Sequence, residues 1–226
     1  MGEVVVVMGA GPGLGRAVAT ALARRDAAVA LLARSAVRLA DLAGEVSEAG
    51  RGRALPVAVD LADEESVRTA FAMVRQELGD PTVVIHNPSV TIEAAATATP
   101  YGALVDALRT SVGSLLLAAQ EVSPAMRAAG RGTILATGSQ AALAGSTWSA
   151  AVGVQKAAVR NLVLSLAAEL GPDGVHVATV TVMGSLGTPG FAVEAIAEEY
   201  TRLVDETGGP PDRWRTEVAW HAGGAR

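Results

Sequence analysis

Residues 9–15 combine residue types that can hold a phosphate group. Their sequence is Gly-Ala-Gly-Pro-Gly-Leu-Gly, directly after a valine-rich apolar run. Glycines at a strand-to-helix turn let the backbone approach a pyrophosphate, and the helix N-terminus adds amide hydrogens and a positive dipole. The glycines fit a Gly-xxx-Gly-x-Gly spacing, whereas the usual Gly-x-Gly-xx-Gly pattern fails. A tight turn would also need glycine, but a place in the first strand–helix unit favours a nucleotide site. The predicted contacts are Gly9, Gly11, Gly13, Leu14 and Gly15.

The end of the second expected strand bears on the choice of dinucleotide. A carboxylate there would bind the ribose 2′-hydroxyl of NAD, but the sequence has Ala33 followed by Arg34 and Ser35. An arginine can instead make a bidentate, charge-assisted contact with the 2′-phosphate of NADP. We therefore expect NADP(H) to be favoured over NAD(H). Asp60, ending the third expected strand, would accept a hydrogen bond from the adenine amino group or cap a helix.

Lys156 is the only lysine, and the other 17 of the 18 basic residues are arginines. Such a ratio is typical of a coding bias toward arginine. A lysine that survives this bias is a candidate for a task that arginine cannot perform, because the two cations differ in geometry and in how readily their pKa shifts. The alternative is an exposed helix lysine with no particular role.

Strand and helix signals alternate along the whole chain. Strands are expected at 3–8, 28–33, 54–59, 82–86, 133–137, 175–182 and 215–220, and helices at 13–25, 36–49, 64–78, 101–129, 147–170 and 191–205. This order predicts an α/β fold, a Rossmann-like, doubly wound, parallel seven-stranded sheet with helices on both faces. We expect one dinucleotide-binding domain, 1–226, in which a substrate segment, 183–214, precedes the last strand. The tail, 221–226, is expected to fray.

Composition excludes several classes of protein. The chain has 226 residues, of which 50% are hydrophobic and 18% charged, which suits one folded domain and not a disordered chain. A net charge of −5 gives no sign of a nucleic-acid partner. With no cysteine and three scattered histidines, no metal site is expected. No run of about 18 apolar residues and no basic leader are present, so we expect a cytoplasmic protein with no membrane segment.

Over nearly its whole length the chain resembles the short-chain dehydrogenase/reductase family. The glycine spacing, Asp60 and Asn87 match the family, although Met8 stands where the family usually has threonine. Residues 132–135 and 167–177 are similar to the family's passages into strands five and six. The resemblance implies a Rossmann fold, a nicotinamide dinucleotide cofactor and oxidoreductase activity.

The family's Pro-Gly-xxx-Thr motif is matched by Gly184 and Thr188, with Met183 in place of proline. The resemblance implies that Asn87, Gly184, Thr188 and Lys156 contact the cofactor. It also implies a homodimer or homotetramer. The alanine-rich stretch 147–170 would allow close packing across a twofold axis, or packing on the chain's own sheet.

The catalytic positions are where the match fails. The family has a serine, a tyrosine 13 residues later and a lysine four residues beyond, and this chain has Ser139, Val152 and Lys156. The asparagine that supports a proton relay falls at Ser111, counted back from Pro124. The resemblance implies that the serine orients a carbonyl and that the lysine binds the nicotinamide ribose. Since valine carries no proton, we interpret the chain as an atypical member that lacks the catalytic tyrosine.

Four interpretations of this departure stay open. In the preferred one, the protein is an NADP(H)-dependent oxidoreductase for a small or medium apolar carbonyl, imine or enone, with the proton supplied by a water on Lys156 or by Ser139. In the second, Tyr101 or His86 supplies the proton, since histidine has a suitable pKa; the role we favour for His86 is to back the cofactor loop. In the third, the fold performs isomerisation, elimination or cyclisation. In the fourth, the chain is a non-catalytic pseudoenzyme that binds a dinucleotide.

The substrate pocket is expected to be apolar. Val152, Trp148 and Met183 would line it, with Trp148 one helical turn before Val152. The family keeps its substrate lid in the segment that corresponds to 183–214, and this segment is short here. A short lid suggests an open site, a large substrate, or cover from a neighbouring subunit.

Overall fold

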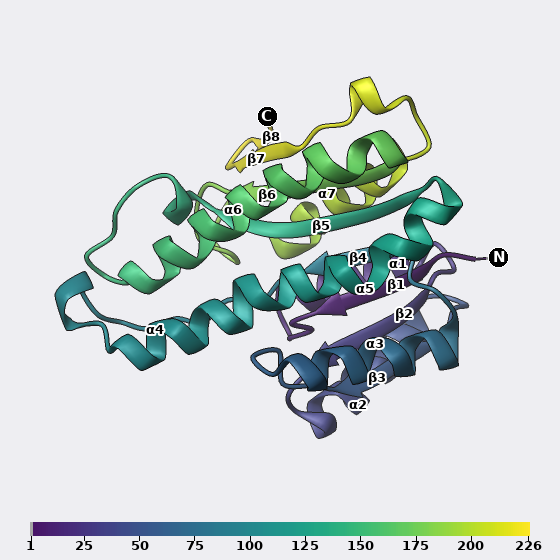
Figure 1. Ribbon diagram of the computed structural model, residues 1–226, viewed down its shortest axis with the longest axis horizontal. Helices are drawn as coiled ribbons and strands as arrows, with labels where there is room; N and C mark the ends of the chain where they lie inside the picture. Colours follow the sequence, from purple (N-terminus) through teal and green to yellow (C-terminus); the bar gives the residue numbers. More distant parts are fainter. Residues whose placement is uncertain (1) are drawn as a thin grey trace.

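The structure, a computed structural model, describes residues 2–226 and contains in this range one eight-stranded sheet (Figure 1). The strand order is β3-β2-β1-β4-β5-β6-β7-β8. Strands β1 to β7 pair in parallel, and β8 pairs antiparallel with β7. The strands are β1 Val4–Met8, β2 Ala28–Ala33, β3 Ala54–Ala58, β4 Val83–His86, β5 Gly132–Ser139, β6 Val175–Val182, β7 Glu217–His221 and β8 Gly224–Ala225. The predicted Rossmann-like architecture is confirmed, with one strand more than expected.

Helices cover both faces of the sheet. The α-helices are α1 Leu14–Ala23, α2 Ala36–Ala49, α3 Glu64–Leu78, α4 Tyr101–Leu108, α5 Ser114–Ala129, α6 Ala150–Leu170 and α7 Val193–Glu206. One apolar cluster joins α1, α2 and α7 to the sheet, and a second joins α3, α5 and α6 to the opposite face. Successive strand side chains point to opposite faces, so Val5 and Val7 belong to the first cluster and Val6 and Met8 to the second. This explains why the first strand is apolar at every position.

Two predicted element boundaries are wrong. The tail 221–226 does not fray, because Arg226 and Ala219 exchange two backbone hydrogen bonds as β8 turns back on β7. The helix expected at 147–170 begins at Ala150, where the Ser149 hydroxyl accepts a hydrogen bond from the N–H of Val152. Trp148 therefore lies before α6 and not one helical turn before Val152.

The predicted helix 101–129 is continuous but irregular. A π-helical segment, Arg109–Gly113, joins α4 to α5, and Pro124 lies inside α5 without breaking it. By length and composition this helix is apolar enough to cross a membrane, with a mean hydropathy of 1.3 in its most apolar window. Because α5 packs on the sheet through Leu115, Val122 and Met126, a core helix explains this composition as well. That the chain has no membrane segment therefore stays a prediction.

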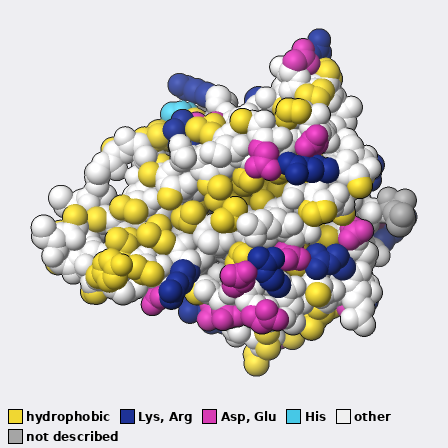
Figure 2. All heavy atoms as spheres, viewed as in Figure 1, with side chains coloured by type: hydrophobic (Ala, Val, Ile, Leu, Met, Phe, Trp, Pro, Cys, Tyr) yellow, Lys and Arg dark blue, Asp and Glu magenta, His cyan; other side chains and the backbone are white. Residues whose placement is uncertain are grey.

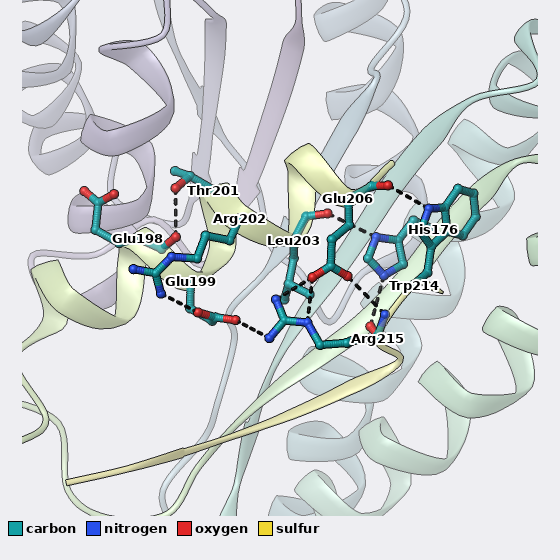
Figure 3. Close-up of polar contacts among 9 residues, drawn as sticks. All are labelled: His176, Glu198, Glu199, Thr201, Arg202, Leu203, Glu206, Trp214 and Arg215. Atoms are coloured by element: carbon teal, nitrogen blue, oxygen red, sulfur yellow. Dashed lines mark hydrogen bonds and ion pairs between the residues drawn. The ribbon is translucent and has the colours of Figure 1, made fainter. Parts of the chain in front are cut away.

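Much of segment 183–214 is fastened to the body of the protein. Glu199 of α7 is 1% exposed, and its carboxylate pairs with Arg202 and Arg215 at 2.7 Å each (Figure 3). His176 of β6 lies between the carbonyls of Leu203 and Arg215 and stacks on Trp214. Because a buried carboxylate needs such partners, α7 is held against β6 and β7. The part of this segment left to border a ligand site is its beginning.

Candidate active site

A cavity of about 1210 Å³ runs along the carboxyl edge of the sheet. Its lining includes the residues at or just after the ends of six parallel strands, because parallel strands end at the same edge. The crevice at this edge, where the strand order reverses between β1 and β4, is the usual ligand site of a doubly wound sheet. The strand-end residues in the lining are Gly9, Ala33, Asp60, Asn87, Ser139 and Val182.

The glycine loop, residues 9–15, forms one end of this cavity. Gly9 has φ +73°, and a Cβ atom there would lie 3.0 Å from the nitrogen of Pro88, so only glycine fits. A Cβ atom on Gly15 would lie 2.9 Å from the carbonyl oxygen of Gly9. Gly11 and Gly13 face open space, with no atom of the described chain within 4 Å of a built Cβ. The loop is thus rigid where it meets the protein and open where it faces the cavity.

The N-terminus of α1 is available to a ligand. Within the described residues no side chain caps it, and Gly13 is the N-cap residue. The first amide hydrogens of a helix need an outside acceptor. Leu14 and Gly15, which open α1, also line the cavity. This arrangement suits an anionic group such as a phosphate.

Basic side chains gather beside the end of β2. The predicted cofactor contacts Arg34 and Ser35 line the cavity, and so does Arg38, which the sequence reasoning missed. Among the described residues neither Arg34 nor Arg38 has an ion-pair partner. The signal for Arg38 was its place in the first turn of α2, three residues after the N-cap Ser35, because the start of this helix lies at the same edge of the sheet as the end of β2. Two free guanidinium groups therefore border the same part of the cavity.

Asp60 lines the cavity, but it does not cap a helix. Its carboxylate accepts a hydrogen bond from the N–H of Ala62 at 3.0 Å. The N-cap residue of α3 is Asp63, which accepts from the N–H of Ser66. The helix-cap alternative for Asp60 is therefore wrong, and its second carboxylate oxygen remains for a ligand.

Lys156 lies at the other end of the cavity with its ammonium group held by backbone. Its Nζ donates to the carbonyl of Thr137 at 2.7 Å and to that of Pro88 at 3.2 Å. The residue is 5% exposed, and burial lowers the pKa of its amine from 10.5 to about 8. An ammonium has three hydrogens, so one remains for the cavity. The exposed-lysine alternative is wrong.

The loop after β4 is fixed by side chains of α6 and of its N-cap. The side-chain oxygen of Gln155 accepts a hydrogen bond from the N–H of Val90 at 3.1 Å, and its side-chain nitrogen donates to the carbonyl of Val90 at 2.8 Å. Ser149 donates to the carbonyl of Ile92 at 2.7 Å. Sequence reasoning missed Gln155, which precedes the lone lysine and is fully buried. A buried glutamine needs hydrogen-bond partners for both its side-chain oxygen and its side-chain nitrogen. Gln155 therefore fixes the position of the loop after β4, which forms the cavity wall that faces α6.

The structure brings together three of the predicted catalytic and substrate residues. Ser139, Val152 and Lys156 all line the cavity. The hydroxyl oxygen of Ser139 accepts the N–H of Ala141 at 3.2 Å. Its own hydrogen is therefore free to point to a ligand. Gly184 and Asn87 also border the same space.

Four predicted site residues lie outside this lining. Ser111 is buried and donates to the carbonyl of Ala107 within its own helix, whereas the preceding Thr110 lines the cavity. Trp148 is 59% exposed. Met183 and Thr188 are also absent from the cavity wall, although Leu186 between them belongs to it.

The alternative proton donors do not reach the cavity. His86 is buried and bonds the hydroxyl of Ser114 at 2.8 Å. Burial and the charge of Lys156 lower the pKa of His86 to about 3, so it is neutral at pH 7, contrary to the expectation of a suitable pKa. Tyr101 is 83% exposed on α4. None of the described lining residues is a tyrosine or a histidine.

A chain of hydrogen bonds lies behind the inner end of the cavity. The hydroxyl groups of Tyr200 and Thr137 are 2.6 Å apart, Thr137 donates to Asn87 at 2.9 Å, and Asn87 donates to the carbonyl of Gly9 at 3.2 Å. Burial raises the pKa of Tyr200 far above its usual value. Tyr200 therefore supports Thr137 and the glycine loop and is not an acid for the cavity.

Comparison with known proteins agrees with this geometry. Residues 3–195 match the short chain dehydrogenase family. A short chain dehydrogenase of Pseudocercospora fijiensis is 29% identical over 210 residues, 87% of this chain and 65% of that protein, so the chain spans just under two thirds of this relative. The 2-(R)-hydroxypropyl-CoM dehydrogenase of Xanthobacter autotrophicus is 30% identical over 192 residues, 84% of this chain and 76% of that one. A metagenomic short-chain oxidoreductase, solved with NADP, superposes with a TM-score of 0.86, 27% identity and 96% coverage of both chains.

The hydrogen-bond chain predicts an unequal effect of two substitutions. Thr137→Val leaves the Tyr200 hydroxyl buried without its partner and should lower the free energy of unfolding by about 1–3 kcal/mol. Tyr200→Phe removes that hydroxyl and leaves Thr137 bonded to Asn87, so its cost should be smaller. Urea unfolding of both variants and of the double variant measures this. Equal losses of unfolding free energy in the two single variants, or additive losses in the double variant, would contradict the hydrogen bond between Thr137 and Tyr200.

Proposed function

The chain belongs to the short chain dehydrogenase family, and we propose that it is a cytoplasmic, NADP(H)-dependent oxidoreductase that works without the family's catalytic tyrosine. Its substrate is a small or medium apolar carbonyl, imine or enone. The observation that carries the proposal is the cavity itself, which joins the glycine loop at one end to Ser139 and Lys156 at the other. The dinucleotide bound by the metagenomic relative supports the choice of cofactor.

The residues present fit a dinucleotide. The open space beside Gly11 and Gly13 and the uncapped start of α1 suit a pyrophosphate. Arg34 and Arg38 suit a 2′-phosphate, since a guanidinium binds phosphate in a bidentate manner. Lys156 would donate its third ammonium hydrogen to a ribose hydroxyl or to the substrate. When bound, the reduced cofactor supplies a hydride.

The chain's own contribution is to position and polarise the substrate. Ser139 would donate its free hydroxyl hydrogen to the substrate oxygen, and Lys156 would hold positive charge nearby. Val152 presents an apolar surface where the family has its acid. Loss of a general acid typically costs about 10²–10⁴-fold in rate, so this site favours substrates that need little proton transfer. A non-redox enzyme would have the same Val152 but would not need the free arginines beside β2. A dinucleotide-binding pseudoenzyme would use these arginines as well, and it differs in that it oxidises no NADPH with any substrate.

The free arginines predict a cofactor preference that a titration can measure. Quenching of tryptophan fluorescence should show NADPH binding more than tenfold tighter than NADH, about 1.4 kcal/mol. The double variant Arg34→Ala/Arg38→Ala should weaken NADPH to the level of NADH and leave NADH nearly unchanged. Arg131→Ala is the matched control, because Arg131 is exposed and lies outside the cavity. Equal affinities in the unaltered protein would refute the phosphate contact, and binding of neither would refute the oxidoreductase.

We also propose that the protein forms homodimers or homotetramers. Figure 2 shows apolar side chains over the face made by α4, α5 and α6, whereas charged side chains gather over α3. Exposed Leu116 of α5 and Val154 and Leu164 of α6 belong to these helices. Light scattering should give at least twice the chain mass, and Leu116→Glu with Leu164→Glu should lower it to one chain. A monomeric unaltered protein at all concentrations would contradict this.

A further inference from the structure

At the inner end of the cavity, Lys156 and Ser139 each have one hydrogen left to donate to a ligand, because their other hydrogen-bonding positions are occupied by the protein backbone. Two hydrogens of the Lys156 ammonium are used by the carbonyls of Thr137 and Pro88, which leaves one. The Ser139 oxygen accepts the N–H of Ala141, which leaves its hydrogen. Ser139 ends β5 two residues after Thr137, and both Ser139 and Lys156 line the cavity. Two fixed donors bordering one space suit an oxygen atom that carries negative charge.

The carboxylates of the cavity are placed elsewhere. Among the described lining residues, Asp41 and Glu45 lie on α2 and Asp60 follows β3, at the nucleotide end. Asp106 of α4 is the remaining one, and it pairs with Arg109 at 3.3 Å with 68% of its side chain exposed. A carboxylate so exposed and already paired belongs to the rim of the cavity.

Several apolar side chains line the same cavity as these donors. Val152 lies one helical turn before Lys156 on α6, and Val90, Ile92 and Leu186 are also in the lining, together with the hydroxyl-bearing Ser89 and Thr110. His86 of β4 is the titratable group close enough to Lys156 to feel its charge, and it is buried and neutral. The site can therefore stabilise an oxyanion but has no tyrosine, histidine or carboxylic acid beside it.

We propose that the substrate is a conjugated carbonyl compound, either an α,β-unsaturated ketone or a quinone, whose reduction leaves the negative charge on an oxygen held by Ser139 and Lys156. This inference rests on the proposed function and narrows its substrate class. Saturated ketones are poor substrates, because their reduction gives a strongly basic alkoxide that needs a proton at once. An enolate or a phenolate spreads its charge and survives until water protonates it.

The electrons and atoms balance without a protein acid. An unsaturated ketone that accepts a hydride at its β-carbon gains one C–H bond, and its C=C electron pair shifts toward the carbonyl to leave an enolate oxygen. A quinone that accepts a hydride at one carbonyl oxygen gains one O–H bond, and its electrons shift through the ring, which becomes aromatic, to leave a phenolate at the other oxygen. The hydride and its two electrons come from a C–H bond of the reduced nicotinamide dinucleotide of the proposed function, which is oxidised. The enolate or phenolate receives its proton from water once the product leaves. Ser139 and Lys156 donate hydrogen bonds to the oxygen throughout.

Binding of a chromogenic phenol tests the oxyanion site with neither cofactor nor turnover. We use 4-nitrophenol, whose phenolate absorbs visible light. Below pH 8, where Lys156 carries its charge, the protein should bind the phenolate and lower the pKa of the bound phenol. Lys156→Met should weaken phenolate binding about tenfold or more, because a charged hydrogen bond is lost, and Ser139→Ala about threefold. Arg131→Ala should have no effect.

The outcomes separate this inference from the proposed function. An unshifted phenol pKa, or a shift that survives both Ser139→Ala and Lys156→Met, overturns the oxyanion site. If Lys156→Met does not fold, as judged by circular dichroism, Ser139→Ala decides the question. NADPH binding without phenolate binding refutes this inference alone. Phenolate binding without NADPH binding refutes the oxidoreductase and supports the oxyanion site.

Turnover with matched substrates tests the substrate class. With NADPH, the protein should reduce 2-cyclohexenone or 1,4-naphthoquinone at least 100-fold faster than cyclohexanone, in line with the typical contribution of a general acid. Val152→Tyr should raise the rate on cyclohexanone relative to Val152→Phe, which adds the same ring without a hydroxyl. Equal rates on the saturated and the conjugated ketone in the unaltered protein would overturn the proposal.

Discussion

The ammonium of Lys156, held between the carbonyls of Thr137 and Pro88, is the interaction on which the cavity depends. It joins three separate parts of the chain, namely α6, the end of β5 and the loop after β4. An unpaired buried charge costs several kcal/mol, so these elements must hold their carbonyls toward the lysine. Gln155 and Ser149 fix the same loop to the start of α6. The inner wall is thereby defined by hydrogen bonds at fixed positions.

The same constraint links the two ends of the cavity. Thr137 uses its carbonyl for Lys156 and its hydroxyl for Asn87 and Tyr200. Asn87 in turn holds the carbonyl of Gly9, which begins the glycine loop. A dinucleotide spanning the cavity would meet a loop and a lysine positioned by one network. Pre-organisation of this kind lowers the entropy lost when a ligand binds.

The sequence predicted the fold well because strand periodicity, glycine loops and helix caps are local signals. Serine and aspartate favour N-cap positions, and Ser35 and Asp63 cap α2 and α3. The valine-rich run before the glycine loop is the strand β1, buried on both faces. The return of the tail as β8 was missed, because pairing of two residues depends on β7 and not on their own types. The length of the helix beginning at Tyr101 was predicted, but its π-helical segment was not, because this depends on how α4 and α5 pack.

The site was predictable only in part. The glycine loop, Ser139, Val152 and Lys156 line one cavity, and their spacing in the sequence was enough to select them as candidates. Arg38 and Gln155 were missed, since their roles come from which side of a helix meets the cavity or the loop. The expectation for His86 failed because the unperturbed pKa of histidine says nothing about burial beside a lysine.

The most direct test of this account is an NMR titration of Lys156. The chain has one lysine, so labelling lysine with ¹³C and ¹⁵N gives one set of side-chain signals without assignment. Held by two carbonyls and removed from water, its amine should titrate with a pKa of about 8. A pKa near the ordinary value of 10.5 would place the ammonium in solvent and contradict the buried donor at the inner end of the cavity.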